Sequence, residues 1–263
     1  MYLGFFLRRV ILVETINFSQ EGAIARINLN NSSKHNALGS RELSAIRHHL
    51  IEINKKSTAR VLIVSSTSNP TFCAGASLKE LQSGEITSND FQSMTDALAE
   101  TKIPTICAID GNLFGGGAEL ALSCDFRIAA KNIKMRVPAS ALGLCYPVSG
   151  ICRYVERLGH NATKRILLAA ESLSDSQLLE IGFVERVVDS SEFETVVNQS
   201  AENLSKLAPL AIRAMKQIIN KKSSGKLSDE EAEKLARECN ESQDVREGIA
   251  AQREKRAAVF RGI

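Results

Sequence analysis

The sequence lacks the features that mark nucleic-acid-binding and membrane-spanning proteins. Its 33 basic and 30 acidic residues leave a net charge of only +3, and it contains no basic run with interleaved aromatic residues. No apolar stretch approaches the roughly 20 residues that a helix needs to cross a bilayer. The composition therefore predicts a protein that has neither a nucleic acid nor a membrane as its partner.

The cysteines include no C-x-x-C pair of the kind that binds metals or exchanges disulfides. Most of the six lie in apolar runs, where a reduced cysteine behaves as a small hydrophobic residue. His48 and His49 are adjacent and cannot share one helix face as metal ligands. We therefore expect a reducing compartment and no structural metal.

The first fourteen residues, MYLGFFLRRVILVE, are apolar but carry two arginines. They lack the charged leader and the small-residue cleavage site of a secretory signal peptide. We expect a partly disordered extension, with a transit peptide as the alternative. The expected location is the cytoplasm, or the mitochondrial matrix if the source is eukaryotic.

The rest of the chain alternates between strand and helix patterns. Apolar residues are 44% and charged residues 24% of the chain, which is typical of a globular protein. Strands are predicted at 14–20, 23–30, 61–64, 106–109, 126–129, 134–137 and 184–188. Repeated strand-then-helix order predicts an α/β fold with parallel pairing.

Several boundaries follow from local signals. Ser174 with Gln177 and Ser228 with Glu231 have the spacing of capping boxes, and Asn161 is a further candidate cap. The polar residues 82–96 are predicted to form a mobile surface segment, followed by a helix over 97–102. Only helical patterns follow residue 190, so we expect a core domain over 1–200 and a helical region over 201–263.

The stretch from Pro104 to Asp125 carries the clearest chemical signal. Its three consecutive glycines, Gly115 to Gly117, stand between a strand and a short helix, where they allow close approach to the main chain. The first amides of that helix have no intrahelical partners and suit an oxygen that gains negative charge. Glu119 follows half a turn later, beside whatever these amides hold. The alternative is a glycine-rich turn beside a solvated glutamate.

Two segments, AIDGNLFGGGAELALSCDFRIAA and FCAGASLKEL, together resemble the enoyl-CoA hydratase/isomerase (crotonase) superfamily. The resemblance extends over nearly the whole chain, through NAL at 36–38, SDSQLLEIGFVERVV and EGIAAQREKR. It implies a spiral of β-β-α units with a C-terminal helical trimerisation region, assembled as trimers or dimers of trimers. It also implies binding of acyl-CoA thioesters and stabilisation of their enolates. No cofactor is expected, because coenzyme A is part of the substrate.

The resemblance assigns roles to individual residues of this chain. The backbone N–H groups of Ala76 and Gly116 would form the oxyanion hole, and Glu119 would be the catalytic base. Lys255, Arg256 or both would reach the CoA phosphates, perhaps in a neighbouring subunit, although a solvated basic helix face is an equal alternative. The residues implied to contact the substrate are Lys34, His35, Ala37, Ala74, Gly75, Ser77, Leu78, Gly115, Pro138, Leu142 and Lys255.

One position departs from the family pattern. Family hydratases carry a second glutamate directly after the proline of the next loop, but here Pro138 is followed by Ala139. No aspartate or glutamate occurs between Asp125 and Glu156. Tyr146 is a conceivable acid, although packing beside the following proline is the simpler interpretation.

The leading prediction is a hydratase that adds water to a 2-enoyl-CoA. An enoyl-CoA isomerase, a decarboxylase of malonyl-type thioesters and a non-catalytic acyl-CoA-binding protein remain as alternatives, because the second glutamate is missing. A buried Glu119 engaged in an ion pair would count against its role as the base.

Overall fold

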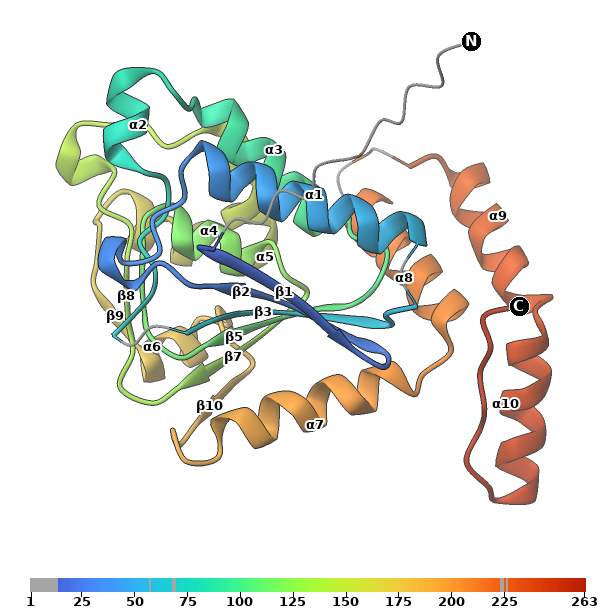
Figure 1. Cartoon of the computed structure of the whole chain (residues 1–263). Helices are drawn as coiled ribbons and strands as arrows, with labels where there is room; N and C mark the ends of the chain where they lie inside the picture. Colours follow the sequence, from blue (N-terminus) through green and yellow to red (C-terminus); the bar gives the residue numbers. More distant parts are fainter. Residues whose placement is uncertain (1–13, 57, 68–69, 223–224, 226) are drawn as a thin grey trace, which may run out of the picture.

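The computed structural model describes residues 14–56, 58–67, 70–222, 225 and 227–263. The expectation for the N-terminal extension therefore lies outside the described residues. Within them, two β-sheets and ten helices form a mixed α/β fold (Figure 1). No helix among the described residues is both long enough and apolar enough to cross a membrane.

The larger sheet has six strands in the order β1-β2-β3-β5-β7-β10. Its strands are β1 (Ile16–Glu21), β2 (Ile24–Leu29), β3 (Val61–Ser66), β5 (Thr105–Ile109), β7 (Phe126–Ala130) and β10 (Arg186–Val188). The β1–β2 pair is antiparallel, as the turn at Glu21-Gly22 predicts, and every other pair is parallel. All five residues of β5 are buried, as is usual for a parallel strand covered on both faces.

The smaller sheet has the order β4-β6-β8-β9. Its strands are β4 (Thr71–Cys73), β6 (Asn112–Phe114), β8 (Lys134–Arg136) and β9 (Leu173–Ser174). The chain passes from β3 to β4, from β5 to β6 and from β7 to β8, moving each time from the larger sheet to the smaller one. This repeated crossing is the predicted spiral of β-β-α units.

Helices cover both faces of the larger sheet (Figure 1). Below it lies α7 (Phe193–Ser205), which contacts β2, β3, β5 and β7. Above it lie α1 (Ser40–Lys56), α4 (Gly116–Leu122) and α5 (Val148–Leu167). The shorter elements are η1 (Ser32–Lys34), α2 (Leu78–Ser83), η2 (Ser140–Leu142) and α6 (Asp175–Glu180).

Two cap predictions can be compared with these helices. The capping box of Ser174 and Gln177 begins α6, as predicted. Gly159 interrupts α5 with a φ of 75°, and the helix resumes directly after it, so Asn161 lies within the next turn and the cap predicted there is wrong.

The predicted mobile segment at 82–96 is wrong. Most of it belongs to α3 (Ser88–Ala99), which begins at a capping box formed by Thr87 and Asp90. Phe91, Met94 and Leu98 are buried at helical spacing on one face of α3. These few apolar positions stand among many polar ones, so the polar composition hides the period. Of the helix predicted over 97–102, only residues 97–99 are helical, and they form the end of α3.

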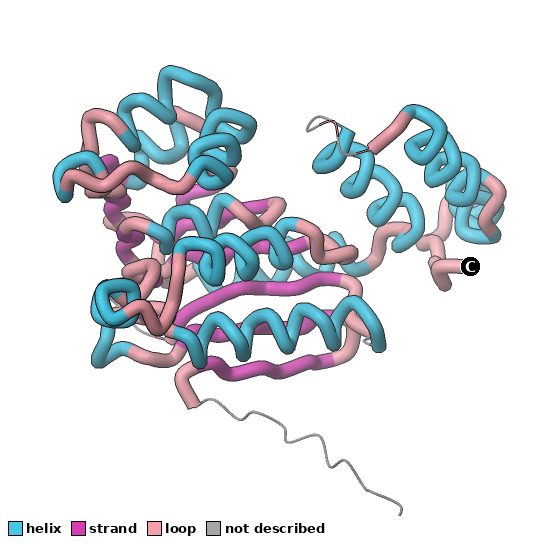
Figure 2. The backbone as a smooth tube through the Cα atoms, turned by 90° about the horizontal axis from the view of Figure 1, so that it is seen from above, coloured by secondary structure: helices cyan, strands magenta, loops and turns pink. Residues whose placement is uncertain are grey.

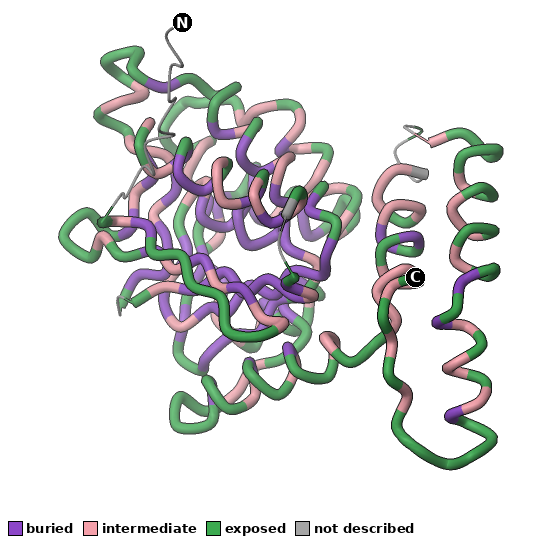
Figure 3. Tube along the Cα trace, turned by 45° about the vertical axis from the view of Figure 1, so that its right-hand side comes forward, coloured by how far each residue is buried: buried purple, intermediate pink, exposed green. Residues whose placement is uncertain are grey.

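The C-terminal helices α8 (Pro209–Lys222), α9 (Asp229–Asn240) and α10 (Gln243–Glu254) lie to one side of the sheets (Figure 2). The capping box predicted at Ser228 and Glu231 begins α9. Buried residues concentrate in the sheets and the helices on them, whereas α9 and α10 are mostly exposed or half-buried (Figure 3). The predicted boundary at residue 200 falls inside α7, which packs on the sheet, and α8 is the next helix.

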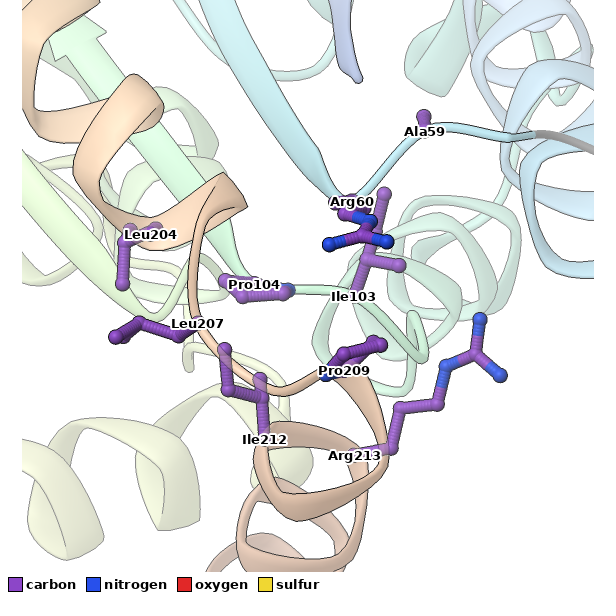
Figure 4. A pocket seen from close by; sticks show the side chains of 9 residues that line it. All are labelled: Ala59, Arg60, Ile103, Pro104, Leu204, Leu207, Pro209, Ile212 and Arg213. Atoms are coloured by element: carbon purple, nitrogen blue, oxygen red, sulfur yellow. The ribbon is translucent and has the colours of Figure 1, made fainter. Parts of the chain in front are cut away.

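A buried lysine fastens α8 to the core. The Nζ atom of Lys216 donates to the carbonyl of Ile103 at 2.9 Å and to Asp125 Oδ2 at 2.6 Å. Beside the turn from α7 to α8, residues of this junction and of the segments just before β3 and β5 line a cavity of only about 10 Å³ (Figure 4). That space is about enough for a single water molecule. The junction is therefore closely packed.

The end of the chain folds back onto α10 and the core. The carboxylate of Asp244, which is buried, accepts hydrogen bonds from the N–H groups of Arg261 at 2.7 Å and Gly262 at 2.9 Å. Arg60, just before β3, donates to the carbonyl of Phe260 at 2.6 Å. The last residues are therefore part of the folded structure.

Candidate active site

Two glycine-bearing loops meet where adjacent parallel strands end. The first follows β4 and the second follows β6, and these strands pair in parallel, so both loops leave the same edge of the smaller sheet. A Cβ atom built on Gly75 would lie 2.5 Å from the nitrogen of Gly116 and 3.0 Å from that of Gly117. Gly75 also has a φ of 87°, in the left-handed region. The close contact between the loops therefore requires glycine at 75.

The Ala76 and Gly116 amides are both available at this junction. Leu38 donates to the carbonyl of Gly75 at 2.8 Å and accepts from Ser77 at 2.9 Å, so the amide of Ala76 between them points away from Leu38. Gly116 is the first residue of α4 and so has no intrahelical acceptor. Among the described loop residues, neither N–H donates to a backbone carbonyl. Two unsatisfied donors in neighbouring loops suit an anionic oxygen.

The loop containing Lys34, His35 and Ala37 lies against the first of these loops. The carbonyl of His35 accepts from Ala74 at 3.0 Å. Asn36, which is buried, donates through its side chain to the carbonyl of Phe72 at 2.9 Å. Asn36 is missing from the predicted site residues, although the NAL motif contains it. Its side-chain amide holds the two loops together.

The loop with Pro138 and Leu142 leaves the same sheet edge, because β8 pairs in parallel with β6. Ala139, the residue after Pro138, directly precedes η2. Leu142 and Leu78 are large apolar residues that are both exposed.

Lys255 does not join these residues within one chain. It follows α10, which lies at the opposite end of the molecule from α2 and α4 (Figure 1). The neighbouring Arg256 binds Glu247 at 2.6 and 2.8 Å and Glu254 at 2.7 Å. Within one chain these two residues therefore lie away from the loops, and their contact with CoA, in this or a neighbouring subunit, stays a prediction.

Glu119 lies in the first turn of α4 and is almost fully buried, at 3% exposure. Tyr146 donates its hydroxyl hydrogen to Oε2 of Glu119 at 2.8 Å. Arg153 Nη1 lies 3.4 Å from Oε1 of the same carboxylate. Tyr146 is thus a partner of Glu119 and does more than pack beside Pro147.

Burial raises the pKa of the Glu119 carboxyl, because a charge there loses its hydration. The hydrogen bond from Tyr146 and the charge of Arg153 each lower this pKa and offset only part of the effect. Burial and the nearby Glu119 charge raise the pKa of Tyr146 well above its ordinary value, so Tyr146 keeps its proton. A carboxylate with a raised pKa accepts and returns protons more readily near neutral pH.

The sequence does not reveal the ion pair between Glu119 and Arg153. Arg153 is on α5, and its guanidinium also forms an ion pair with Asp96 on α3 and donates to Ser123 Oγ at 3.1 Å. This pairing is the observation that counts against Glu119 as a free base. The 3.4 Å contact is long, however, and Asp96 shares the positive charge.

The described residues offer little for metal chemistry. No group of three or more histidine, cysteine, aspartate or glutamate side chains among them could hold a metal ion. The chemical resources at this sheet edge are two unsatisfied amides and one buried carboxylate.

Comparisons with known proteins identify the family. The sequence profile of the enoyl-CoA hydratase/isomerase family matches residues 19–262. Enoyl-CoA hydratase domain-containing protein 2, mitochondrial, of Mus musculus is 32% identical over 263 residues, covering 96% of this chain and 88% of the mouse protein. The short-chain-enoyl-CoA hydratase of Clostridium acetobutylicum is 27% identical over 93% of this chain and 96% of its own length.

A solved structure shares the fold. The crystal structure of enoyl-CoA hydratase from Bacillus anthracis superposes with a TM-score of 0.85, at 26% identity, covering 95% of this chain and 100% of that one. The chain belongs to the enoyl-CoA hydratase/isomerase family.

Proposed function

We propose that the protein is an enoyl-CoA hydratase that adds water across the double bond of a 2-enoyl-CoA thioester. The observation that carries the proposal is the placement of Glu119, a buried carboxylate with a raised pKa, in the helix whose first amide faces the Gly75 loop. The protein would need no cofactor, because the thioester itself carries coenzyme A.

The two amides supply the electrostatic part of the mechanism. When water attacks the β-carbon of the enoyl group, the electron pair of the double bond moves through the α-carbon onto the thioester oxygen. The N–H groups of Ala76 and Gly116 would donate to that oxygen as its charge develops. Losing one such donor typically raises a barrier by about 3 kcal/mol.

Glu119 supplies the acid–base part. Its carboxylate takes a proton from the attacking water, whose oxygen bonds to the β-carbon. The protonated Glu119 then returns that proton to the α-carbon of the enolate, which restores the thioester carbonyl. One carboxylate thus completes the addition of H and OH without a second glutamate at Ala139. Tyr146, hydrogen-bonded to the other carboxylate oxygen, keeps Glu119 oriented during both transfers.

A second candidate is the decarboxylation of a malonyl-type thioester. The ion pair between Glu119 and Arg153 favours it, because loss of CO₂ generates the enolate without any base. The same two amides would stabilise that enolate.

We also propose that the chains associate as trimers or dimers of trimers through the C-terminal helices. Such an assembly would let Lys255 contribute to a neighbouring chain's site, since its own chain's loops lie at the far end of the molecule.

A spectrophotometric assay tests the proposal. Adding the protein to crotonyl-CoA should abolish the absorbance of the conjugated enoyl thioester as water adds. Release of CO₂ from a malonyl-type thioester, with no loss of enoyl absorbance, would establish the second candidate instead. Migration of a 3-enoyl double bond would indicate an isomerase. Binding without turnover of any of these thioesters would indicate a non-catalytic acyl-CoA-binding protein.

A further inference from the structure

Arg153 connects three helices around the candidate base. It lies on α5, binds Asp96 of α3 and reaches Glu119 and Ser123 of α4. The Arg153 side chain is only 12% exposed, and that of Glu119 is 4% exposed, whereas Asp96 is 43% exposed. One guanidinium is therefore shared between a buried carboxylate and a half-exposed one.

We propose that Arg153, held by Asp96, is a positioning residue that fixes the Glu119 carboxylate in place and keeps it in its base form. This inference rests on the proposed role of Glu119 as the catalytic base. No part of the family's sequence motifs in this chain points to Asp96, which lies in a segment that the sequence predicts to be mobile.

The geometry shows how Glu119 is oriented. Arg153 contacts Oε1 and Tyr146 donates to Oε2, so each carboxylate oxygen has a donor, and the Thr95 side chain on α3 is a further hydrogen-bond partner. A carboxylate has about four lone-pair sites, so it can still accept a proton from water. Arg153 and Tyr146 come from α5 and the loop just before it, so this segment orients the carboxylate.

The two charged neighbours act on Glu119 in opposite directions. The positive charge of Arg153 lowers the pKa of Glu119, and the negative charge of Asp96 raises it. Asp96 also binds the other side of the guanidinium. Burial is what keeps the pKa of Glu119 raised, and these two charges adjust that pKa in opposite directions.

The other groups near Glu119 do not supply a charge that could set its pKa in the same way. The titratable or polar groups that face Glu119 or lie against α4 are Tyr146 and Tyr154 from α5 and its preceding loop, Thr95 from α3, Ser123 from α4 and Cys73 from β4. Burial raises the pKa of Tyr154 well above its ordinary value and that of Cys73 to about 12, so both stay neutral. Charge changes near Glu119 therefore come from Arg153 and Asp96.

The test compares two variants that should shift Glu119 in opposite directions. Arg153→Gln removes the positive neighbour and should move the acid limb of the kcat/KM profile to higher pH, lowering relative activity at pH 5.5 by about tenfold. Asp96→Asn removes the negative neighbour and should move the same limb to lower pH. Arg153→Lys, which keeps the charge, should restore the native profile in large part.

A second readout does not depend on turnover. Infrared titration of the carboxyl stretch, with the Glu119 band assigned by its loss in Glu119→Gln, reports protonation of this group directly. Arg165→Gln is the matched control, because Arg165 lies on the same helix but pairs with Glu171 in a partly exposed site. It should leave the Glu119 titration unchanged.

The proposal is supported if the Glu119 titration moves to higher pH in Arg153→Gln and to lower pH in Asp96→Asn. An unshifted infrared titration in Asp96→Asn overturns it, and so does a shift of the same sign in both variants. If Arg153→Gln fails to fold, Asp96→Asn alone decides, because that side chain is partly exposed. The variants could also shift the infrared titration of Glu119 in a protein that hydrates no enoyl thioester. That result would refute the proposed function, but it would still show that Arg153 and Asp96 set the pKa of Glu119.

Discussion

Two arginines in this protein each bind two carboxylates, one in the core and one at the C-terminal end. Arg153 joins Glu119 and Asp96 in the buried region beside α4, whereas Arg256 joins Glu247 and Glu254 beside α10. The side chain of Arg153 is 12% exposed and that of Arg256 is 42% exposed.

Each arginine lowers the pKa of its glutamate, but the net shifts of the two glutamates are opposite. Burial raises the pKa of Glu119 despite its arginine, because the lost hydration outweighs the long contact. Hydrogen bonds from Arg256 and from the amide of Val259 lower the pKa of Glu247 to about 2, because no comparable hydration is lost. The core network therefore surrounds the proposed catalytic base, whereas the surface network binds the amide of Val259 near the end of the chain.

The largest expected difference is in turnover. Glu119→Gln should reduce kcat for hydration by about 10²–10⁴-fold, because it removes the group that moves the proton. Its affinity for acyl-CoA should stay within a few-fold, since the two amides remain. Glu247→Gln is the matched control and should leave kcat unchanged. Full turnover by Glu119→Gln in the crotonyl-CoA assay would show that the base is assigned wrongly.

Two glycines that face phenylalanine rings offer a second comparison. A Cβ atom at Gly116 would lie 2.6 Å from Cζ of Phe91, whereas one at Gly248 on α10 would lie 3.4 Å from Phe260. Gly116→Ala should therefore lower the free energy of unfolding by about 1–3 kcal/mol and raise KM, because Phe91 or the start of α4 must move. Denaturant titration and KM measurements check this.

The control for Gly116→Ala is Gly248→Ala, which should raise stability instead of lowering it. Gly248→Ala meets ordinary van der Waals distances within a helix, so it should raise stability by about 0.5–1 kcal/mol. Equal effects of the two substitutions on KM would contradict the assigned site.

Two lysine–carboxylate ion pairs, one buried and one exposed, allow a third comparison. Lys216→Met should lower the free energy of unfolding by about 3 kcal/mol, because Asp125 loses a buried counterion. Lys234→Met should have no measurable effect, since Lys234 and Glu238 are both exposed and 4.0 Å apart. Chemical denaturation measures both. A stable Lys216→Met protein would mean that α8 is held to the core chiefly by its apolar contacts.

The smallest expected effect is the pH dependence of the stability that Glu247 contributes through its contacts with Arg256 and Val259. Because the folded-state pKa of Glu247 is depressed to about 2, its stabilisation is present above its ordinary value of 4.5 and is lost as pH falls from there towards 2. The Tm difference between the native protein and Glu247→Gln should therefore be constant at neutral pH and narrow below pH 4.5. Added salt should also reduce it. A difference that grows in acid would contradict the sign of this pKa shift.

The sequence predicts the fold well where the pattern is local. The run from Val61 to Val64 and the alternation after Gly22 identify strands, and the spacing of Ser228 and Glu231 identifies a helix start. The three-residue strands β8 and β10 lie within predicted ranges, whereas β4 and β6 escape prediction, because a run such as Asn112 to Phe114 is too short to show any period.

The sequence predicts one part of the candidate site's geometry and misses another, for related reasons. The resemblance concerns loops whose glycines carry a recognisable signal, and the structure brings Gly75 and Gly116 together. Asp96 and Arg153 are 57 residues apart and resemble solvated residues of polar helices. Only the packing of α3 and α5 on α4 brings their charges to Glu119, so no local pattern predicts their pairing.

The contacts made by the last residues limit how far the chain can be shortened. Asp244 is buried, and its carboxylate depends on the amides of Arg261 and Gly262. Deleting the final three residues would leave that charge enclosed without either donor. A shortened protein prepared for crystallography should therefore retain Gly262, and any appended sequence should begin after Ile263.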